Sequence, residues 1–188
     1  MLNDLLFELG TEELPSGAVW PLADALANNV VAGLAKANIQ HGKVYRYATP
    51  RRLAVLIHDV QAQQPGQTIS RRGPAVSAAV DAEGKPLPAL LGFAKSCGVG
   101  IDKLTRTKTD KGEWWVYNTV SAEAHTRDLL PAMMNEAMAQ LPITKPMRWG
   151  YGETLFARPV HWAVLLFGED VVTSNLFGVK TDRYTFGH

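Results

Sequence analysis

Residues 53–57 constrain the fold more than any other stretch of this sequence, because apolar side chains occupy both of their alternating faces. This pattern is typical of a strand that is covered on both sides of a sheet. Pro50 precedes the segment, fixes its own φ and favours an extended Thr49, so Arg51 and Arg52 fall where the strand begins. We therefore expect two guanidinium groups at the start of a buried strand, where they could bind phosphate or carboxylate groups.

Three segments carry the apolar spacing of amphipathic helices. They are residues 17–37, residues 88–97 with Gly98 as the C-terminal cap, and residues 126–141. Strands are expected at residues 5–9, 43–47, 53–60, 104–109, 113–120, 156–167 and 171–179, with a hairpin turn at Asp110-Lys111-Gly112. The pattern predicts an α+β fold, with mixed, mostly antiparallel sheets packed against about three amphipathic helices.

An internal similarity suggests how the chain is organised. Residues 47–56 and 156–165 both place an aromatic residue, an alanine and a proline ahead of Ala-Val-Leu, and both follow a long amphipathic segment. Two related helix-strand-strand units would explain the match, and so would chance in a chain rich in alanine and leucine. We expect a unit over residues 1–80 that carries the basic motifs and a second unit over residues 81–188, in one compact or bilobed domain.

The charge balance excludes a general attraction to nucleic acid. Nineteen basic residues stand against 18 acidic ones, for a net charge of +1, so any RNA contact must come from local clusters. The single cysteine, Cys97, cannot form an internal disulfide and fits a reducing cytosol. The N-terminus has no basic leader, and no apolar run approaches the ~18 residues of a membrane span. We expect a cytoplasmic protein with no membrane partner.

No residue pattern here predicts catalysis. The sequence has no glycine-rich phosphate loop, and its five histidines are isolated, without the paired spacing of a metal site. Glu12 and Glu13 fit a helix N-terminal dipole better than a metal or acid–base pair, and His161 fits a core histidine better than a catalytic one. Trp114 and Trp115 are neighbours in a strand, so at most one belongs to the core. We therefore expect no catalytic residue and no metal site.

The order of several motifs resembles a known family. The matching segments include Met147-Arg148-Trp149-Gly150 and residues 8–15, 48–56, 71–76, 92–99, 109–114, 141–143 and 158–162. Together they resemble the N-terminal part of the bacterial glycyl-tRNA synthetase beta subunit. The resemblance implies a longer chain, with HD-like and anticodon-binding regions beyond His188. It also implies an alpha subunit that activates glycine with ATP and magnesium, and a beta subunit that supplies most of the tRNA recognition, so that this fragment binds no cofactor itself.

The resemblance and the basic motifs together define candidate sites. Candidate RNA-binding residues are Arg51, Arg52, Arg71, Arg72, Lys95, Arg148 and Arg158. Candidate contacts to the alpha subunit or to the remaining beta-subunit domains are Lys145 and Trp149. Arginines that bind one tRNA(Gly) should share a surface, and in the pair Arg51 and Arg52 we expect one structural and one exposed side chain. The alternative is a scaffold that docks on other subunits without touching RNA, its arginines paired with surface acids.

Overall fold

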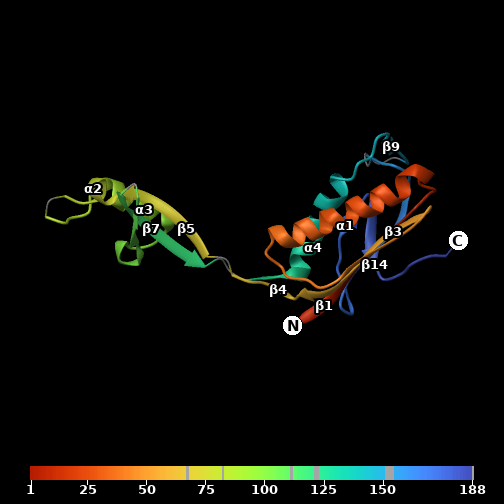
Figure 1. The fold of residues 1–188 in the computed structure, drawn as a ribbon, viewed down its shortest axis with the longest axis horizontal. Helices are drawn as coiled ribbons and strands as arrows, with labels where there is room; N and C mark the ends of the chain where they lie inside the picture. Colours follow the sequence, from red (N-terminus) through yellow and green to blue (C-terminus); the bar gives the residue numbers. More distant parts are fainter. Residues whose placement is uncertain (67, 82, 111, 121–122, 151–154, 188) are drawn as a thin grey trace. The chain divides into compact units, whose positions relative to one another are not determined.

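The computed structural model describes residues 1–66, 68–81, 83–110, 112–120, 123–150 and 155–187. The chain forms two compact units (Figure 1). Unit 1 comprises Met1–Pro65 and Glu123–His188, and unit 2 comprises Gly66–Ala122. Unit 2 is thus inserted within unit 1, and the division expected between residues 80 and 81 falls inside unit 2. The sequence suggested a division in chain order, whereas the strands on both sides of the insertion belong to one sheet.

Unit 1 is built on a seven-stranded sheet in the order β13-β14-β11-β1-β3-β2, with β12 beside β11. Neighbouring strands are antiparallel except β11 and β14, so the sheet is mixed and mostly antiparallel, as predicted. Its strands are β1 (Leu2–Thr11), β2 (Val44–Thr49), β3 (Arg52–Gln61), β11 (Val160–Phe167), β12 (Asp170–Val171), β13 (Asn175–Leu176) and β14 (Val179–Asp182).

Two helices, α1 (Val19–Lys36) and α4 (Thr126–Ala139), pack on one face of this sheet (Figure 1). A short 3₁₀ turn at Ser16–Ala18 leads into α1. The apolar stripe expected for α1 is buried at all of its five positions, Val19, Leu22, Leu26, Val30 and Leu34. It meets the α4 face and the strand residues Leu5, Phe7, Leu9, Leu53, Val55 and Ile57 in one core. Burial of this apolar surface is the main favourable contribution to the folding of unit 1.

The opposite face of the same sheet has no helix over it among the described residues. Strand side chains alternate between the two faces. Leu53, Val55, Ile57 and Leu165 face the helices and are buried, as expected. Leu56 points to the other face and is only half-buried, so the expectation that β3 is covered on both sides is wrong at this position. Leu166 of β11 is half-buried on the same face. Val164, also on that face, is buried.

Unit 2 is a three-stranded antiparallel sheet, β5-β7-β6, covered on one face by helices. Its elements are β5 (Thr68–Ala75), α2 (Val76–Ala79), α3 (Pro88–Cys97), a 3₁₀ turn at Ile101–Lys103, β6 (Thr105–Thr109) and β7 (Gly112–Val120). Its small core consists of Ala79, Leu90, Ala94, Leu104 and Trp115. The predicted hairpin is present as β6 and β7, and Lys111 in its turn lies outside the described residues.

Short strand pairs complete unit 1. β4 (Gln63–Gln64) and β8 (Ala124–His125) pair antiparallel where the chain leaves and re-enters unit 1. β9 (Met147–Arg148) pairs in the same way with β10 (Leu155–Phe156). β4 is not among the strands expected from the sequence, because it is only two residues long and Pro65 and Gly66 follow it directly.

The internal similarity has a limited structural counterpart. β3 and β11, which hold its two copies, lie on either side of β1 and are both antiparallel to it. Val55 and Val164 are equivalent in the alignment, yet Val55 pairs with Phe7 and Val164 with Glu8, which point to opposite faces. A shift of one residue exchanges the two faces of a strand. Equivalent residues of the two copies therefore have different environments.

Candidate nucleic-acid interface

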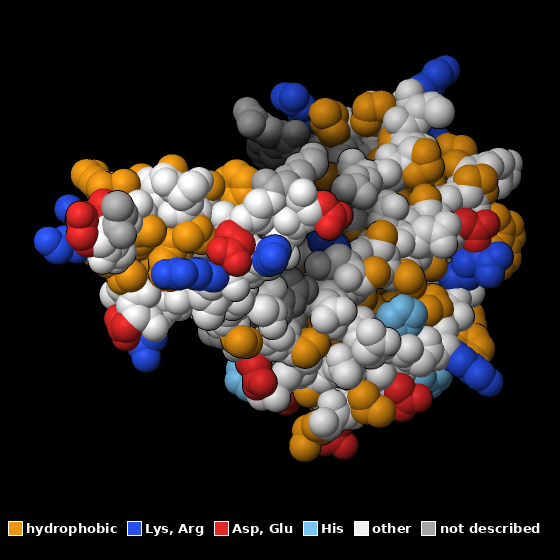
Figure 2. All heavy atoms as spheres, turned by 60° about the vertical axis from the view of Figure 1, so that its left-hand side comes forward, with side chains coloured by type: hydrophobic (Ala, Val, Ile, Leu, Met, Phe, Trp, Pro, Cys, Tyr) orange, Lys and Arg blue, Asp and Glu red, His pale blue; other side chains and the backbone are white. Residues whose placement is uncertain are grey.

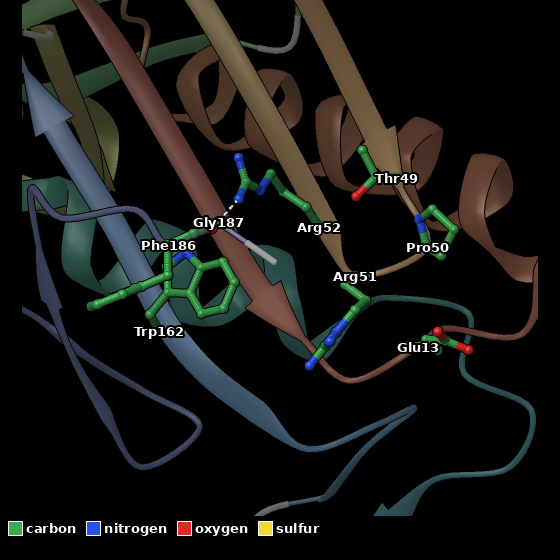
Figure 3. A pocket seen from close by; sticks show the side chains of 8 residues that line it. All are labelled: Glu13, Thr49, Pro50, Arg51, Arg52, Trp162, Phe186 and Gly187. Carbon is green, nitrogen blue, oxygen red and sulfur yellow. Dashed lines mark hydrogen bonds between the residues drawn. The ribbon is translucent and has the colours of Figure 1, made fainter.

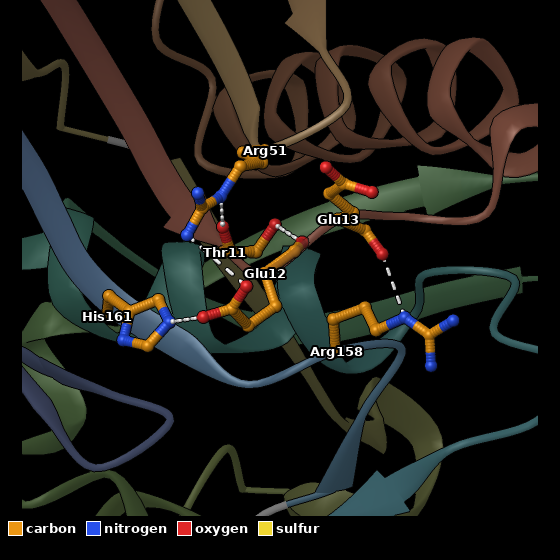
Figure 4. Close-up of polar contacts among 6 residues, drawn as sticks. All are labelled: Thr11, Glu12, Glu13, Arg51, Arg158 and His161. Carbon is orange, nitrogen blue, oxygen red and sulfur yellow. Dashed lines mark hydrogen bonds and ion pairs between the residues drawn. The ribbon is translucent and has the colours of Figure 1, made fainter. Parts of the chain in front are cut away.

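Arg51 lies at the end of unit 1 where β1 runs into the loop before α1. Its Nη2 is 3.2 Å from Oε2 of Glu12, and its Nε donates to the carbonyl of Thr11 at 3.5 Å (Figure 4). The other carboxylate oxygen of Glu12 accepts a 2.7 Å hydrogen bond from Nε2 of His161. This hydrogen bond, helped by the charge of Arg51, holds the pKa of Glu12 below its usual range. Glu12 therefore ties the ends of β1, β3 and β11 together, and does not serve as a helix-dipole residue.

His161 is exposed on β11, so the expectation of a core histidine is wrong. The apolar neighbours of His161 in the sequence suggested burial. In the structure Val160 is buried and His161 points the other way, toward Glu12, at the end of the strand.

The side chain of Arg52 lies on the face of the unit 1 sheet that has no helix over it among the described residues. Its Nη1 is 3.6 Å from Oε2 of Glu8, its guanidinium carbon is 5.6 Å from the ring centroid of Trp162, and its Nη2 donates to the carbonyl of Phe186 (Figure 3). Glu8 is 9% exposed and also accepts a 2.8 Å hydrogen bond from Nε1 of Trp162. Arg52 is thus the cation that balances a buried carboxylate.

The prediction that one of Arg51 and Arg52 is exposed is wrong. Both side chains are half-buried and both are paired with carboxylates. They line a cavity of about 440 Å³ together with Glu13, Thr49, Pro50, Trp162, Phe186 and Gly187 (Figure 3). Since Glu8, Glu12 and Glu13 lie beside the two arginines, this cavity offers no excess of positive charge to a phosphate.

The remaining candidates of unit 1 differ in their surroundings. Arg158 donates from Nε to the carbonyl of Glu13 at 2.8 Å and so fastens the loop before α1 (Figure 4). Trp149 is half-buried and packs against the main core. Arg148 on β9 and Lys145 before it are exposed. Exposure keeps these two cations accessible to an RNA or protein partner.

In unit 2, the neighbouring residues Arg71 and Arg72 point to opposite faces of the sheet. Arg71 donates from Nη1 to the carbonyl of Ser96, near the end of α3, at 3.3 Å. On the other face the guanidinium of Arg72 lies 3.6 Å from the ring centroid of Trp114. Trp115 faces the helices and is 8% exposed, which confirms that only one of the two tryptophans belongs to the core. Lys95 is exposed on α3.

The face of the unit 2 sheet that carries Arg72 has no acidic side chain among the described residues of its strands. Paired residues in an antiparallel sheet share a face, and the register places only polar uncharged or apolar side chains beside Arg72 and Trp114. They are Thr68, Ser70, Thr105, Thr107, Thr109, Val116, Asn118 and Val120. This face therefore presents a stacked cation and aromatic ring among hydroxyl and amide groups.

The charge of the chain is divided unevenly between the units. Unit 2 contains eight basic and five acidic residues, whereas unit 1 contains 11 basic and 13 acidic ones. On the surface drawn in Figure 2, basic and acidic side chains are interspersed. The face drawn there thus carries mixed charge, and the excess of basic residues belongs to unit 2.

Comparison with known proteins assigns the family. A family model described as "Glycyl-tRNA synthetase beta subunit" matches residues 5–188. The chain belongs to this family. Similar relatives named "Glycine--tRNA ligase beta subunit" come from Marinobacter nauticus, which is 47% identical over 99% of the present chain, and from Xylella fastidiosa strain M12, which is 49% identical over 100% of the present chain. The chain spans 27% and 26% of these two relatives. Most of such a beta subunit therefore lies outside the 188 residues.

The candidate arginines are divided between the two units. Arg51, Arg52, Arg148 and Arg158 belong to unit 1, and Arg71 and Arg72 to unit 2. Sequence reasoning missed Glu8 and Trp162, which contact Arg52, and it did not link Glu12 to Arg51. The only signal of Glu8 and Trp162 was chemical type, a carboxylate and an indole in otherwise apolar strands. No helix in the described part of the chain is long and apolar enough to cross a membrane.

Proposed function

We propose that this chain is a tRNA-binding and assembly segment of the beta subunit of glycine–tRNA ligase, acting in the cytoplasm. Glycine would be activated with ATP and magnesium at the alpha subunit, and unit 2 would contact tRNA(Gly). The observation that supports the RNA contact is the stack of Arg72 on Trp114, on a sheet face whose described strand residues include no carboxylate. Proteins bind unpaired bases by stacking them on aromatic rings and guanidinium planes.

The chemistry of this face suits unpaired nucleotides. Arg72 is exposed and can offer a guanidinium plane to a base and N–H donors to a phosphate. Thr105, Thr107 and Asn118 surround it with hydroxyl and amide groups that bind base edges or a 2′-hydroxyl. The net positive charge of unit 2 adds a favourable electrostatic contribution.

Unit 1 fits the second candidate, a scaffold for assembly. Arg51, Arg52 and Arg158 make contacts within unit 1, to Glu12, to Glu8 and to the carbonyl of Glu13. An arginine that neutralises a buried carboxylate is not free to neutralise a phosphate. We therefore propose that unit 1 supports the alpha subunit and the rest of the beta subunit, with Lys145, Arg148 and Trp149 as candidate partner contacts.

The test is a tRNA titration of the assembled alpha–beta enzyme at several salt concentrations, with Arg72→Ala and Arg71→Ala as a matched pair. Loss of one stacked cation should weaken binding about 5- to 150-fold, which corresponds to the 1–3 kcal/mol typical of one stacked base. It should also reduce the slope of log affinity against log salt by about one. Arg71 lies on the opposite face of the same strand, so Arg71→Ala should leave the tRNA affinity and the salt slope nearly unchanged. Equal effects of the two variants, or none, would refute an RNA contact at this face.

A further inference from the structure

Strand β2 forms one edge of the unit 1 sheet, and its outer side is open. In the described part of the chain, β3 is the only strand beside it. The N–H of His58 donates to the carbonyl of Lys43 at 2.9 Å, and bonded and non-bonded pairs alternate along an antiparallel ladder. Three residues of β2 therefore direct their backbone N–H and C=O groups outward, away from β3: Val44, Arg46 and Ala48.

This edge lacks the features that keep exposed strands from pairing. Soluble proteins protect such edges with charged side chains, prolines or bulges. The pairing of β2 with β3 is regular over all six residues of β2, none of which is a proline, and five of the six are exposed. Its one charged side chain, Arg46, turns toward α1, where it is paired with Asp24 and lies 5.8 Å from the ring centroid of Trp20. The edge is therefore open to another strand.

Two cavities flank this edge, near opposite ends of β2. The first is the cavity of about 440 Å³ described above, which Thr49 and Pro50 line at the C-terminal end of the strand (Figure 3). The second, of about 400 Å³, is lined by Asp24, Ala27 and Asn28 of α1 and by Val44 and Arg46 of β2. An extended segment that runs along β2 from the first cavity to the second needs to span about 20 Å, the length of six strand residues.

The C-terminal segment of the chain leads into the first cavity. After β14, Thr185 donates a hydrogen bond to the carboxylate of Glu8 on β1, and the carbonyl of Phe186 accepts one from Arg52 on β3. Gly187 then lines the first cavity together with the turn that joins β2 to β3 (Figure 3). The segment thus passes from β1 across β3 toward the C-terminal end of β2.

We propose that the residues that follow position 188 in the beta subunit pair with β2 as a further strand, antiparallel to it. The chain matches the N-terminal part of the family's beta subunit and spans 27% of a relative, so most of such a subunit follows. A segment that continues from Gly187 starts at the C-terminal end of β2 and runs along the edge in the opposite direction to β2. Its side chains would alternate between the second cavity and the side of Tyr45 and Tyr47, which are 40% and 53% exposed. This inference rests on the family and the fold of unit 1, and not on the RNA contact proposed for unit 2.

A tethered strand fits this edge better than a free partner does. The unpaired N–H and C=O groups of an edge strand bind an extended polypeptide, which excludes RNA. A stable complex between free proteins buries about 800 Å² on each partner, much more than one six-residue edge supplies. A segment joined to Gly187 needs less contact area, because its short connection sets a high effective concentration beside β2.

The experiment measures hydrogen exchange at single backbone amides of β2. It compares the 188-residue chain, the same chain extended by about 15 of the residues that follow it, and the full-length beta subunit, all without alpha subunit or tRNA. We expect the amides of Val44, Arg46 and Ala48 to exchange at least about tenfold more slowly in both longer proteins. The amides of Tyr45 and Tyr47 point to β3 and are the internal control, since they should be protected in all three proteins.

Four results would overturn the inference. The first is equally fast exchange of the outward amides in all three proteins, even if adding the alpha subunit or tRNA later slows it. The second is slow exchange in the full-length subunit only, which would indicate a more distant segment of the beta subunit. The third is exchange that slows as the concentration of the 188-residue chain rises, which would indicate a second copy. The fourth is equal slowing at Tyr45 and Tyr47, because general stabilisation would explain it. Selective slowing in both longer proteins supports the proposal even if Arg72 has no role in tRNA binding.

Discussion

Replacing Arg52 with alanine should destabilise unit 1 without altering how the protein responds to salt when it binds tRNA. The change removes the cation beside Glu8, the hydrogen bond to the carbonyl of Phe186 and the contact with Trp162. A buried charged group left without its partner costs about 1–3 kcal/mol. The Arg52 side chain is 33% exposed, so water replaces part of the lost interaction and we expect about 2 kcal/mol. For a chain of this length that lowers the Tm by about 4–8 °C.

The assay is thermal unfolding followed by far-ultraviolet circular dichroism, together with tRNA affinity of the assembled enzyme at several salt concentrations. Arg148→Ala is the matched control, because Arg148 is exposed on β9 and its loss should change stability by less than about 0.5 kcal/mol. The reasoning fails if Arg52→Ala leaves the Tm within about 1 °C of the parent and lowers the salt slope by about one. That outcome would make Arg52 a phosphate contact.

Three further predictions follow from the same contacts. Gly10→Ala should lower the free energy of unfolding by about 1–3 kcal/mol through overpacking, because a Cβ there would lie 2.0 Å from the indole of Trp162. Gly17→Ala is the control: a Cβ there meets no atom within 4 Å, so urea titration should find its stability nearly unchanged. The pKa of Glu12 is lowered, first by the hydrogen bond from His161, so ionised Glu12 stabilises the fold above the ordinary carboxyl range, and this stability is lost as pH falls through the lowered pKa. Glu12→Gln removes this titration and should therefore flatten the decline of Tm between about pH 6 and roughly pH 3. An unchanged decline would contradict the prediction. The 188-residue chain alone should show no glycine-dependent pyrophosphate exchange, since it has no phosphate-binding loop, and exchange above background would disprove this.

Local signals in the sequence predicted the elements whose ends are fixed by local chemistry. Helix α3 runs over Pro88–Cys97 as expected, because Pro88 suits a first turn and Gly98 adopts a left-handed φ of 69°. Strand β5 was not predicted. Its residues alternate poorly, with Ile69 as the one large apolar side chain before Gly73, and its pairing with β7 supplies the order that its own sequence does not.

The candidate site was harder to predict, because its contacts join residues far apart in the sequence. Glu12 and His161 are 149 positions apart, and Glu8 and Trp162 are 154 apart. The sequence marked the arginines as cations at the start of strands, and that placement is correct for Arg52 on β3. Whether such a cation is balanced by a carboxylate depends on strand order and register, which one sequence does not specify.

The insertion of unit 2 also bears on how unit 1 can fold. The sheet of unit 1 and the β4–β8 pair form only when the two ends of the 57-residue stretch Gly66–Ala122 come together. Closing a flexible loop of that length costs roughly 2 kcal/mol more than closing a four-residue turn. A folded unit 2 removes most of that entropy cost, because pairing of Thr68 with Val120 already holds its two ends side by side. Each unit is thereby stabilised by the other through chain connectivity alone. A short turn would also hold the two ends of unit 1 together, so replacing unit 2 with such a turn should preserve the fold of unit 1.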